Sequence, residues 1–124
     1  MRNKKKNVID YSKKDKSKMN FAGRDFRKGE FYMTKFIDSN LEGVEFNAAK
    51  LKYSSLINAN LRNANFTGAY LTGANLTGAD LRGADFNSAK LDGANFKDAI
   101  IDESTNFSSS SLKKAKNLKV PASE

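Results

Sequence analysis

Large hydrophobic residues return at every fifth position of this chain from Phe21 to Ile101, seventeen times in succession. Five steps along an α-helix advance by about 140° beyond a full turn, so these side chains would spread around a helix and form no single stripe. In a straight strand, an odd spacing sends successive side chains to opposite faces. The spacing therefore predicts a chain that bends once in every five residues and buries all of these side chains in one interior.

The residues around each large centre predict how a five-residue unit, or pentad, is built. Two residues before the centre, ten of the eleven residues from Ala49 to Ala99 are Ala and the other is Ser54. A small residue at this distance shares the face of an extended segment with the centre, so both can point inward. Two residues after the centre, Gly recurs, which is typical of a corner with positive φ. These glycines are Gly23, Gly43, Gly68, Gly73, Gly78, Gly83 and Gly93.

Runs such as ANFTG at Ala64–Gly68 and ADLRG at Ala79–Gly83 resemble the A(D/N)LXX consensus of the pentapeptide-repeat family. The resemblance extends over most of the chain. It implies an all-β fold, a right-handed quadrilateral β-helix with four pentads per coil, in which the centre and the small residue face inside. The seventeen pentads would form about four coils of such a solenoid.

Residues twenty apart should then lie in one column, and the spacing predicts a column of phenyl rings from Phe26, Phe46, Phe66 and Phe86. We expect three segments in the chain. They are a flexible basic arm at 1–18, the β-helix at 19–103, and a C-terminal cap and tail at 104–124.

Both ends of the repeat are irregular. Arg24 occupies an inward position of the first coil, where its side chain would extend from an open end into solvent. After Ile101 the spacing slips by one residue, to Phe107 and Leu112. We interpret residues 104–120 as a segment that closes the last coil; the alternative is a disordered tail.

The composition argues against an enzyme. The chain has no cysteine and no histidine, so it lacks disulfides, thiol nucleophiles, the commonest metal ligands and the commonest general base. Its carboxylates fall mostly at outward pentad positions, where no pocket is predicted. We therefore expect no catalytic site, no metal, no cofactor and no small-molecule substrate. No apolar stretch approaches the ~20 residues of a membrane span, and no signal-peptide core is evident, so we expect a cytoplasmic protein.

The net charge of +8 is concentrated at the two ends of the chain. Residues 1–20 carry eight Lys and Arg against two Asp, whereas residues 21–103 carry ten against eleven acidic residues and are nearly neutral. The basic residues of the arm suit attraction to nucleic acid, a ribosome or an anionic membrane surface. They are Arg2, Lys4, Lys5, Lys6, Lys13, Lys14, Lys16 and Lys18. The alternative is that the arm only keeps the protein soluble.

Several outward positions depart from polarity and predict a protein-binding patch. Tyr32, Met33, Tyr53 and Tyr70 should lie on one side of the solenoid, with lysines at the rim. Ile37 and Ile57 should stack on the next side. An exposed apolar cluster of this kind is typical of a protein-interaction surface or of a homodimer. The alternative is that Tyr and Ile are simply good strand formers.

The prediction from sequence is therefore a non-enzymatic protein-interaction or scaffold module that presents a rigid β-helix surface. Binding of an anionic partner through the N-terminal arm is the first alternative. A second alternative comes from the resemblance, because gyrase-protecting members of the family resemble DNA in size and acidic surface. Such mimicry needs a long and strongly negative rod, and the repeat tract here is short and nearly neutral.

Overall fold

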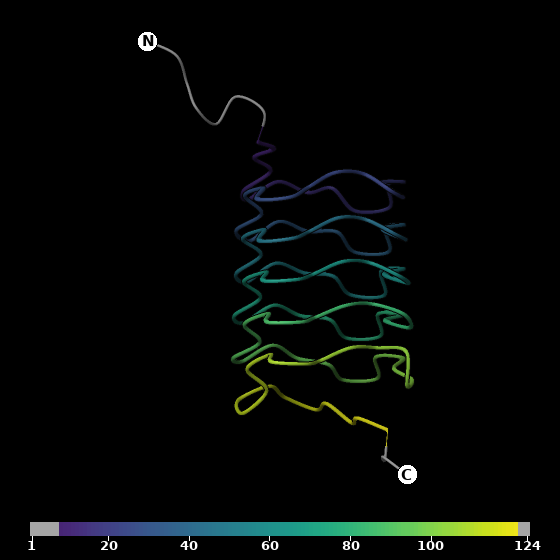
Figure 1. Ribbon diagram of the computed structural model, residues 1–124. Helices are drawn as coiled ribbons and strands as arrows, with labels where there is room; N and C mark the ends of the chain where they lie inside the picture. Colours follow the sequence, from purple (N-terminus) through teal and green to yellow (C-terminus); the bar gives the residue numbers. More distant parts are fainter. Residues whose placement is uncertain (1–7, 122–124) are drawn as a thin grey trace.

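The computed structural model describes residues 8–121, which wind as a four-sided solenoid (Figure 1). These residues form no helix, and their β-structure consists of single-residue parallel bridges between positions about twenty apart. The bridges begin with Asp10↔Glu30 and recur at every fifth residue as far as Asp80↔Ile100. Each turn of the chain therefore takes four pentads, and the turns stack as layers in Figure 1.

The same backbone hydrogen bonds repeat in each pentad. The Phe31 N–H donates to the Lys50 carbonyl at 2.7 Å, and the Lys50 N–H donates to the Gly29 carbonyl at 2.9 Å. These two bonds join one layer to the next. Between one pentad and the next, the Thr34 N–H donates to the Phe31 carbonyl at 3.1 Å and closes the corner. These hydrogen bonds pair backbone N–H and carbonyl groups both between the layers and at the corners. No strand longer than one residue is needed for this.

The corners have positive φ, as the recurring glycines predict. The residue two positions after the centre has φ between 56° for Asn58 and 78° for Gly83. Glycine adopts this conformation without a steric penalty, whereas other residues are strained in it. Non-glycine residues at these corners therefore need a separate explanation.

The pentad centres form the core, as predicted. From Phe21 to Phe96 every centre is buried, with at most 3 % of its surface exposed. The predicted phenyl column is confirmed, with ring centroids 5.6 Å apart for Phe26 and Phe46, 5.3 Å for Phe46 and Phe66, and 4.6 Å for Phe66 and Phe86. Phe107 extends the column, 5.1 Å from Phe86.

The solenoid begins earlier than the predicted boundary at residue 18, and this corrects the extent of the arm. Asp10 and Asp15 already form bridges to the next layer. Tyr11 occupies a centre position, and its ring lies 5.8 Å from that of Phe26. Lys16 occupies the next centre, with its ammonium 4.4 Å from the Tyr11 ring centroid. A lysine can hold this position because the first turn has an open side, where its stem packs and its charge reaches water.

The predicted one-residue slip is also present. After Ile100 the bridges continue between residues 21 apart, from Asp85↔Asn106 to Asn95↔Lys116. The Thr105 hydroxyl donates to the Leu81 carbonyl at 2.8 Å beside the inserted residue. Leu112, Ala115 and Leu118 pack, partly buried, against the core. Residues 106–116 therefore continue the ladder.

Two sides of the solenoid differ in the side chains that they present to solvent. The side that we call the Asn–Asp face consists of pentads 19–23, 39–43, 59–63 and 79–83. The side that we call the Lys–Tyr face consists of pentads 9–13, 29–33, 49–53, 69–73 and 89–93. Both names refer to the outward side chains of these pentads, since the centres and small residues point inside.

Candidate functional site

On the Asn–Asp face, the residue before each centre caps its own corner. The Asn20 side-chain oxygen accepts the Ala22 N–H at 3.1 Å, and Asn40 accepts the Glu42 N–H at 3.1 Å. Asn60 and Asp80 do the same for Arg62 and Arg82, at 3.2 Å and 3.3 Å. This contact between an Asn or Asp side chain and the N–H two residues on is a common turn motif. It gives an acceptor to an N–H that the layer bonds leave unused.

On the Lys–Tyr face this capping is missing from the third to the fifth turn. Asp10 accepts the Ser12 N–H at 3.0 Å, but farther along the same column stand Lys50, Tyr70 and Lys90. A lysine side chain has no acceptor. No side chain among the described residues accepts a hydrogen bond from the N–H of Lys52, Thr72 or Asp92. This face therefore lacks a stabilising contact that the Asn–Asp face has.

The corners of the Lys–Tyr face show a second departure. Met33 and Tyr53 occupy the left-handed position with φ of 57° and 59°, where the next two turns have Gly73 and Gly93. A bulky residue in this conformation is unusual. The Tyr53 ring lies over Gly73, where an added Cβ would come within 2.5 Å of the ring. Glycine at position 73 thus makes room for an aromatic side chain at the corner above it.

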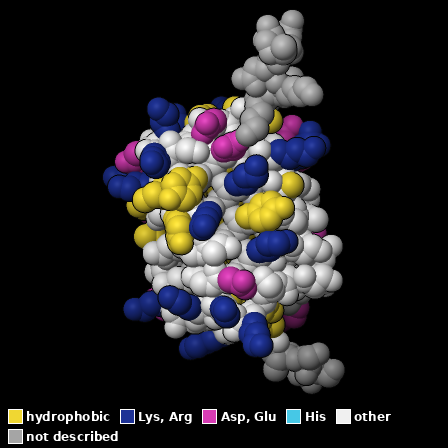
Figure 2. All heavy atoms as spheres, turned by 90° about the vertical axis from the view of Figure 1, so that its left-hand side faces the viewer, with side chains coloured by type: hydrophobic (Ala, Val, Ile, Leu, Met, Phe, Trp, Pro, Cys, Tyr) yellow, Lys and Arg dark blue, Asp and Glu magenta, His cyan; other side chains and the backbone are white. Residues whose placement is uncertain are grey.

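Each tyrosine of this face has an ammonium group beside its ring. The distances from Nζ to the ring centroid are 6.0 Å for Lys13 and Tyr32, 5.2 Å for Lys52 and Tyr53, and 5.1 Å for Lys90 and Tyr70. Tyr32 and Tyr53 also contact each other edge to face, at 6.1 Å. Figure 2 shows one side of the molecule on which exposed hydrophobic groups alternate with Lys and Arg. Such cation–π pairs hold positive charge next to exposed apolar surface.

A groove of about 300 Å³ lies within this arrangement. Its walls are Tyr32 and Tyr70, with Lys50 and Lys52 between them and Glu30 at one end. A neighbouring hollow of about 340 Å³ shares Glu30, Lys50 and Tyr70 with it. Because a lysine presents an apolar stem below its charge, the groove combines an apolar lining with ammonium groups at the rim.

The six residues of the predicted patch lie on two neighbouring sides, as the sequence places them. Tyr32, Met33, Tyr53 and Tyr70 lie on the Lys–Tyr face, with exposed fractions of 40 %, 48 %, 51 % and 41 %. Ile37 and Ile57 lie on the next side and are half-buried. They stack one turn apart, since the Asp38 N–H donates to the Ile57 carbonyl at 2.9 Å. That the isoleucines and the tyrosines act as one binding patch stays a prediction.

The predicted basic residues divide into two groups. Arg2, Lys4, Lys5 and Lys6 lie outside the described residues. Lys13, Lys14, Lys16 and Lys18 lie within the first turn, and Lys13 stands beside Tyr32 on the Lys–Tyr face. Part of the basic set and most of the apolar patch thus share one surface. Sequence reasoning missed Lys90 and Glu30. Both occupy the position where the consensus has Asp or Asn; Lys90 is twenty residues from Tyr70, and Glu30 is twenty residues from Lys50.

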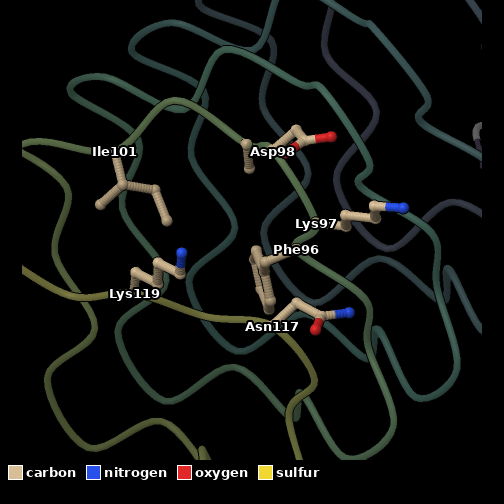
Figure 3. A pocket seen from close by; sticks show the side chains of 7 residues that line it. Phe96, Lys97, Asp98, Ile101, Asn117 and Lys119 are labelled. Atoms are coloured by element: carbon tan, nitrogen blue, oxygen red, sulfur yellow. The ribbon is translucent and has the colours of Figure 1, made fainter.

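A second pocket, of about 290 Å³, lies at the C-terminal end of the solenoid. The residues that line it are Phe96, Lys97, Asp98, Ala99, Ile101, Asn117 and Lys119 (Figure 3). Ile101 was predicted to be covered as the last centre, and it is half-buried here.

Asp25 and Asp80 form ion pairs with the arginines two residues after them. A hydrogen bond from Arg27 lowers the pKa of Asp25 from 3.8 to about 2. A hydrogen bond from Arg82 at 2.6 Å likewise lowers the pKa of Asp80. A general acid at neutral pH needs the opposite, a raised pKa. In the part of the chain that the structure describes, no three His, Cys, Asp or Glu residues come together as metal ligands. No helix suited to crossing a membrane occurs among these residues.

The repeat itself identifies the family. Matches to the family model for pentapeptide repeats, described as eight copies, together cover residues 30–116. The chain belongs to the pentapeptide-repeat family. No curated protein sequence matches this pentapeptide-repeat protein.

Solved pentapeptide-repeat structures resemble the chain. The alr5209 protein of Nostoc PCC 7120 is 21 % identical, with a TM-score of 0.67 over 81 % of this chain and 85 % of that one. AT2G44920, from the thylakoid lumen of Arabidopsis thaliana, is 32 % identical over 86 % of this chain and 70 % of its own, with a TM-score of 0.31. QnrB1, a plasmid-mediated fluoroquinolone resistance protein, is 14 % identical over 92 % and 91 % of the two chains, with a TM-score of 0.40. The likeness to alr5209 shows the fold alone.

Proposed function

We propose that this pentapeptide-repeat protein is a non-enzymatic protein-interaction module whose binding surface is the Lys–Tyr face. The observation that supports the proposal most strongly is the loss of corner capping at Lys50, Tyr70 and Lys90. Side chains that do not cap a corner, at positions where Asn or Asp would cap it, point to a role in binding. Exposed tyrosines are also the side chains most enriched at protein interfaces.

The test compares two double variants of the full-length protein. Tyr53→Ser/Tyr70→Ser removes two aromatic groups from the Lys–Tyr face, and Met19→Ser/Ile100→Ser removes two exposed apolar groups elsewhere. Proteins captured by the wild type would be purified and their dissociation constants measured against all three forms. We expect the tyrosine variant to bind at least about tenfold more weakly and the control to bind as the wild type does. Equal binding by all three would contradict the proposal.

Self-association is a separate outcome of the same variants. If the partner is a second copy of the chain, sedimentation would show a wild-type dimer that the tyrosine variant lacks. A solenoid of this size would need to cover much of one face to form a stable dimer.

The alternative of charge-mediated binding through the N-terminal arm retains one supporting observation, the concentration of lysines in the first turn. Deletion of residues 1–7 combined with Lys14→Glu/Lys18→Glu would abolish binding in that case, while the tyrosine variant would bind normally. For the topoisomerase alternative, a supercoiling assay with DNA gyrase is the direct test. The nearly neutral repeat tract leads us to expect no protection in that assay.

We further propose that the regular repeat comprises about four coils and that residues 104–120 cap the last of them. Phe107 supports this role because its ring lies 5.1 Å from Phe86 and 6.0 Å from Phe96. A chain ending at Glu103 would lack Phe107 and expose the rings of Phe86 and Phe96, so it should aggregate. A monomeric, equally stable truncated chain in size-exclusion chromatography would exclude a capping role.

A further inference from the structure

We propose that the groove between Tyr32 and Tyr70 binds an extended acidic peptide segment with an apolar anchor residue. This inference rests on the proposed protein-binding role of the Lys–Tyr face. It adds the chemistry of the partner: carboxylates that meet the lysines, and one aromatic or aliphatic side chain that enters the groove.

The positive charge of the face favours an acidic segment. Lys50 and Lys52 line the groove itself, and Lys90 lies one layer below Tyr70 and 5.1 Å from its ring. Lys13 flanks Tyr32 on the other side. A segment crossing the groove would thus meet ammonium groups except at the end where Glu30 stands, and Glu and Asp are the natural counter-charges of these lysines.

The apolar part of the groove supplies the anchor site. Tyr32 and Tyr70 stand at opposite corners, since they lie two layers apart and on either side of their pentad centres. The lysine stems between them complete the apolar lining. A volume of about 300 Å³ is large enough for one aromatic or branched side chain. An anchor buried in this way contributes most of the affinity of a small interface.

The same groove is poorly suited to single-stranded nucleic acid. Base stacking requires a free ring face, but Tyr32, Tyr53 and Tyr70 each have an ammonium beside the ring, and Tyr32 meets Tyr53 edge to face. A phosphate backbone carries a charge at every nucleotide and would also pass Glu30 at the end of the groove. A peptide can place its carboxylates at the lysines alone.

The test uses four fluorescent probes and the full-length protein. The first is a ten-residue peptide in which Glu and Asp alternate with Phe and Leu. The second replaces every acid with Lys or Arg, the third contains only Glu, and the fourth is a thymidine oligonucleotide. Fluorescence anisotropy would be measured at about 50 mM and about 500 mM NaCl.

We expect the first peptide to bind most tightly and to lose at least about tenfold in affinity at the higher salt. Tyr32→Ser/Tyr70→Ser should weaken it by at least about tenfold. Lys50→Glu/Lys52→Glu should weaken it further and reverse the preference between the first two peptides. The matched control is Lys35→Glu/Lys97→Glu, which makes the same charge change on the side that carries Ile37 and should keep the wild-type preference.

Two results would overturn the inference. They are equal binding of the acidic and basic peptides, and tighter binding of the oligonucleotide than of any peptide. Neither result affects the proposed function, which is tested by the captured protein and the Tyr53→Ser/Tyr70→Ser variant. Conversely, if that variant keeps its captured partner while the acidic peptide still binds the groove, the proposed function is wrong and the peptide site remains. Thermal unfolding of each variant would show that it is folded.

Discussion

The Asn–Asp face and the Lys–Tyr face have the same backbone conformation. They differ in whether their side chains accept hydrogen bonds from the corner N–H groups and in which residues occupy the corners. On the Asn–Asp face, Asn20, Asn40, Asn60 and Asp80 each cap a corner. Three of its corners hold glycine, at Gly23, Gly43 and Gly83. On the Lys–Tyr face the capping residues are replaced by Lys50, Tyr70 and Lys90, and two corners hold Met33 and Tyr53 in a strained conformation.

This difference separates the needs of the fold from those of a binding surface. Every side of a repeat solenoid has the same local requirements, so one side serves as an internal control for another. If one side has corner caps and another side lacks them, the stability of the fold does not explain the side chains of the uncapped side. A substitution in the core should affect both faces equally, whereas substitutions at the corners and caps should separate them.

The largest effect is expected for Phe66→Ala. Phe66 is buried and stacks between Phe46 and Phe86, so its removal leaves a cavity that the layers cannot fill. Urea unfolding should show a loss of about 3–5 kcal/mol. Peptide binding by the variant that remains folded should be unchanged. A loss below about 1 kcal/mol would mean that the column is loosely packed.

The next largest change in stability is expected for substitutions at the corner positions. Gly93 has φ of 74°, and an added Cβ there would meet only ordinary contacts with the Gly73 backbone, the nearest at 3.6 Å. Gly93→Ala should therefore lose about 1–2 kcal/mol through backbone strain alone. Met33→Gly, in the same column, should gain stability. Unfolding measurements in which the two changes have the same sign would refute the strain at these corners.

These two experiments concern features that the sequence predicted well. The spacing of the centres located the interior, the phenyl column and the corners, because each is repeated many times. The first turn was missed, since Tyr11 and Lys16 stand in centre positions without being aliphatic or Phe. Their role becomes visible only when the end of the solenoid is seen to be open, with Lys16 over Tyr11.

The candidate site was harder to predict than the fold. Tyr32, Tyr53 and Tyr70 were found by their apolar character, but the groove depends on which lysine stems lie between them. Ile37 and Ile57 were predicted to stack on the next side, and they lie there, one turn apart. The capping difference could have been read from the Asn and Asp positions once residues twenty apart were aligned.

A direct comparison of the faces comes from alanine substitutions. Asn60→Ala removes a corner cap on the Asn–Asp face and should lose about 1 kcal/mol of unfolding free energy. Lys50→Ala removes a side chain that caps nothing and should change it by less than about 0.5 kcal/mol. Comparable losses in urea unfolding would show that lysine stabilises the corner in another way.

The smallest effect concerns acid stability. Because the Arg27 hydrogen bond lowers the folded-state pKa of Asp25 from 3.8 to about 2, the carboxylate contributes stability above about pH 4 that is lost as the pH falls towards 2. Asp25→Asn keeps the turn acceptor but removes this charge. Its melting temperature should fall less than that of the wild type between about pH 5 and about pH 2. Asp80→Asn should act in the same direction on the Asn–Asp face.

The unfolding free energy and the acidic-peptide affinity of Lys50→Asn/Lys90→Asn, measured together, test the central claim most directly. Asparagine at these two positions would restore the corner caps and remove two charges from the binding face. We predict a protein that is about 1–2 kcal/mol more stable and binds the acidic peptide at least about tenfold more weakly. A variant that is less stable than the wild type, or that binds the peptide equally well, would contradict the account.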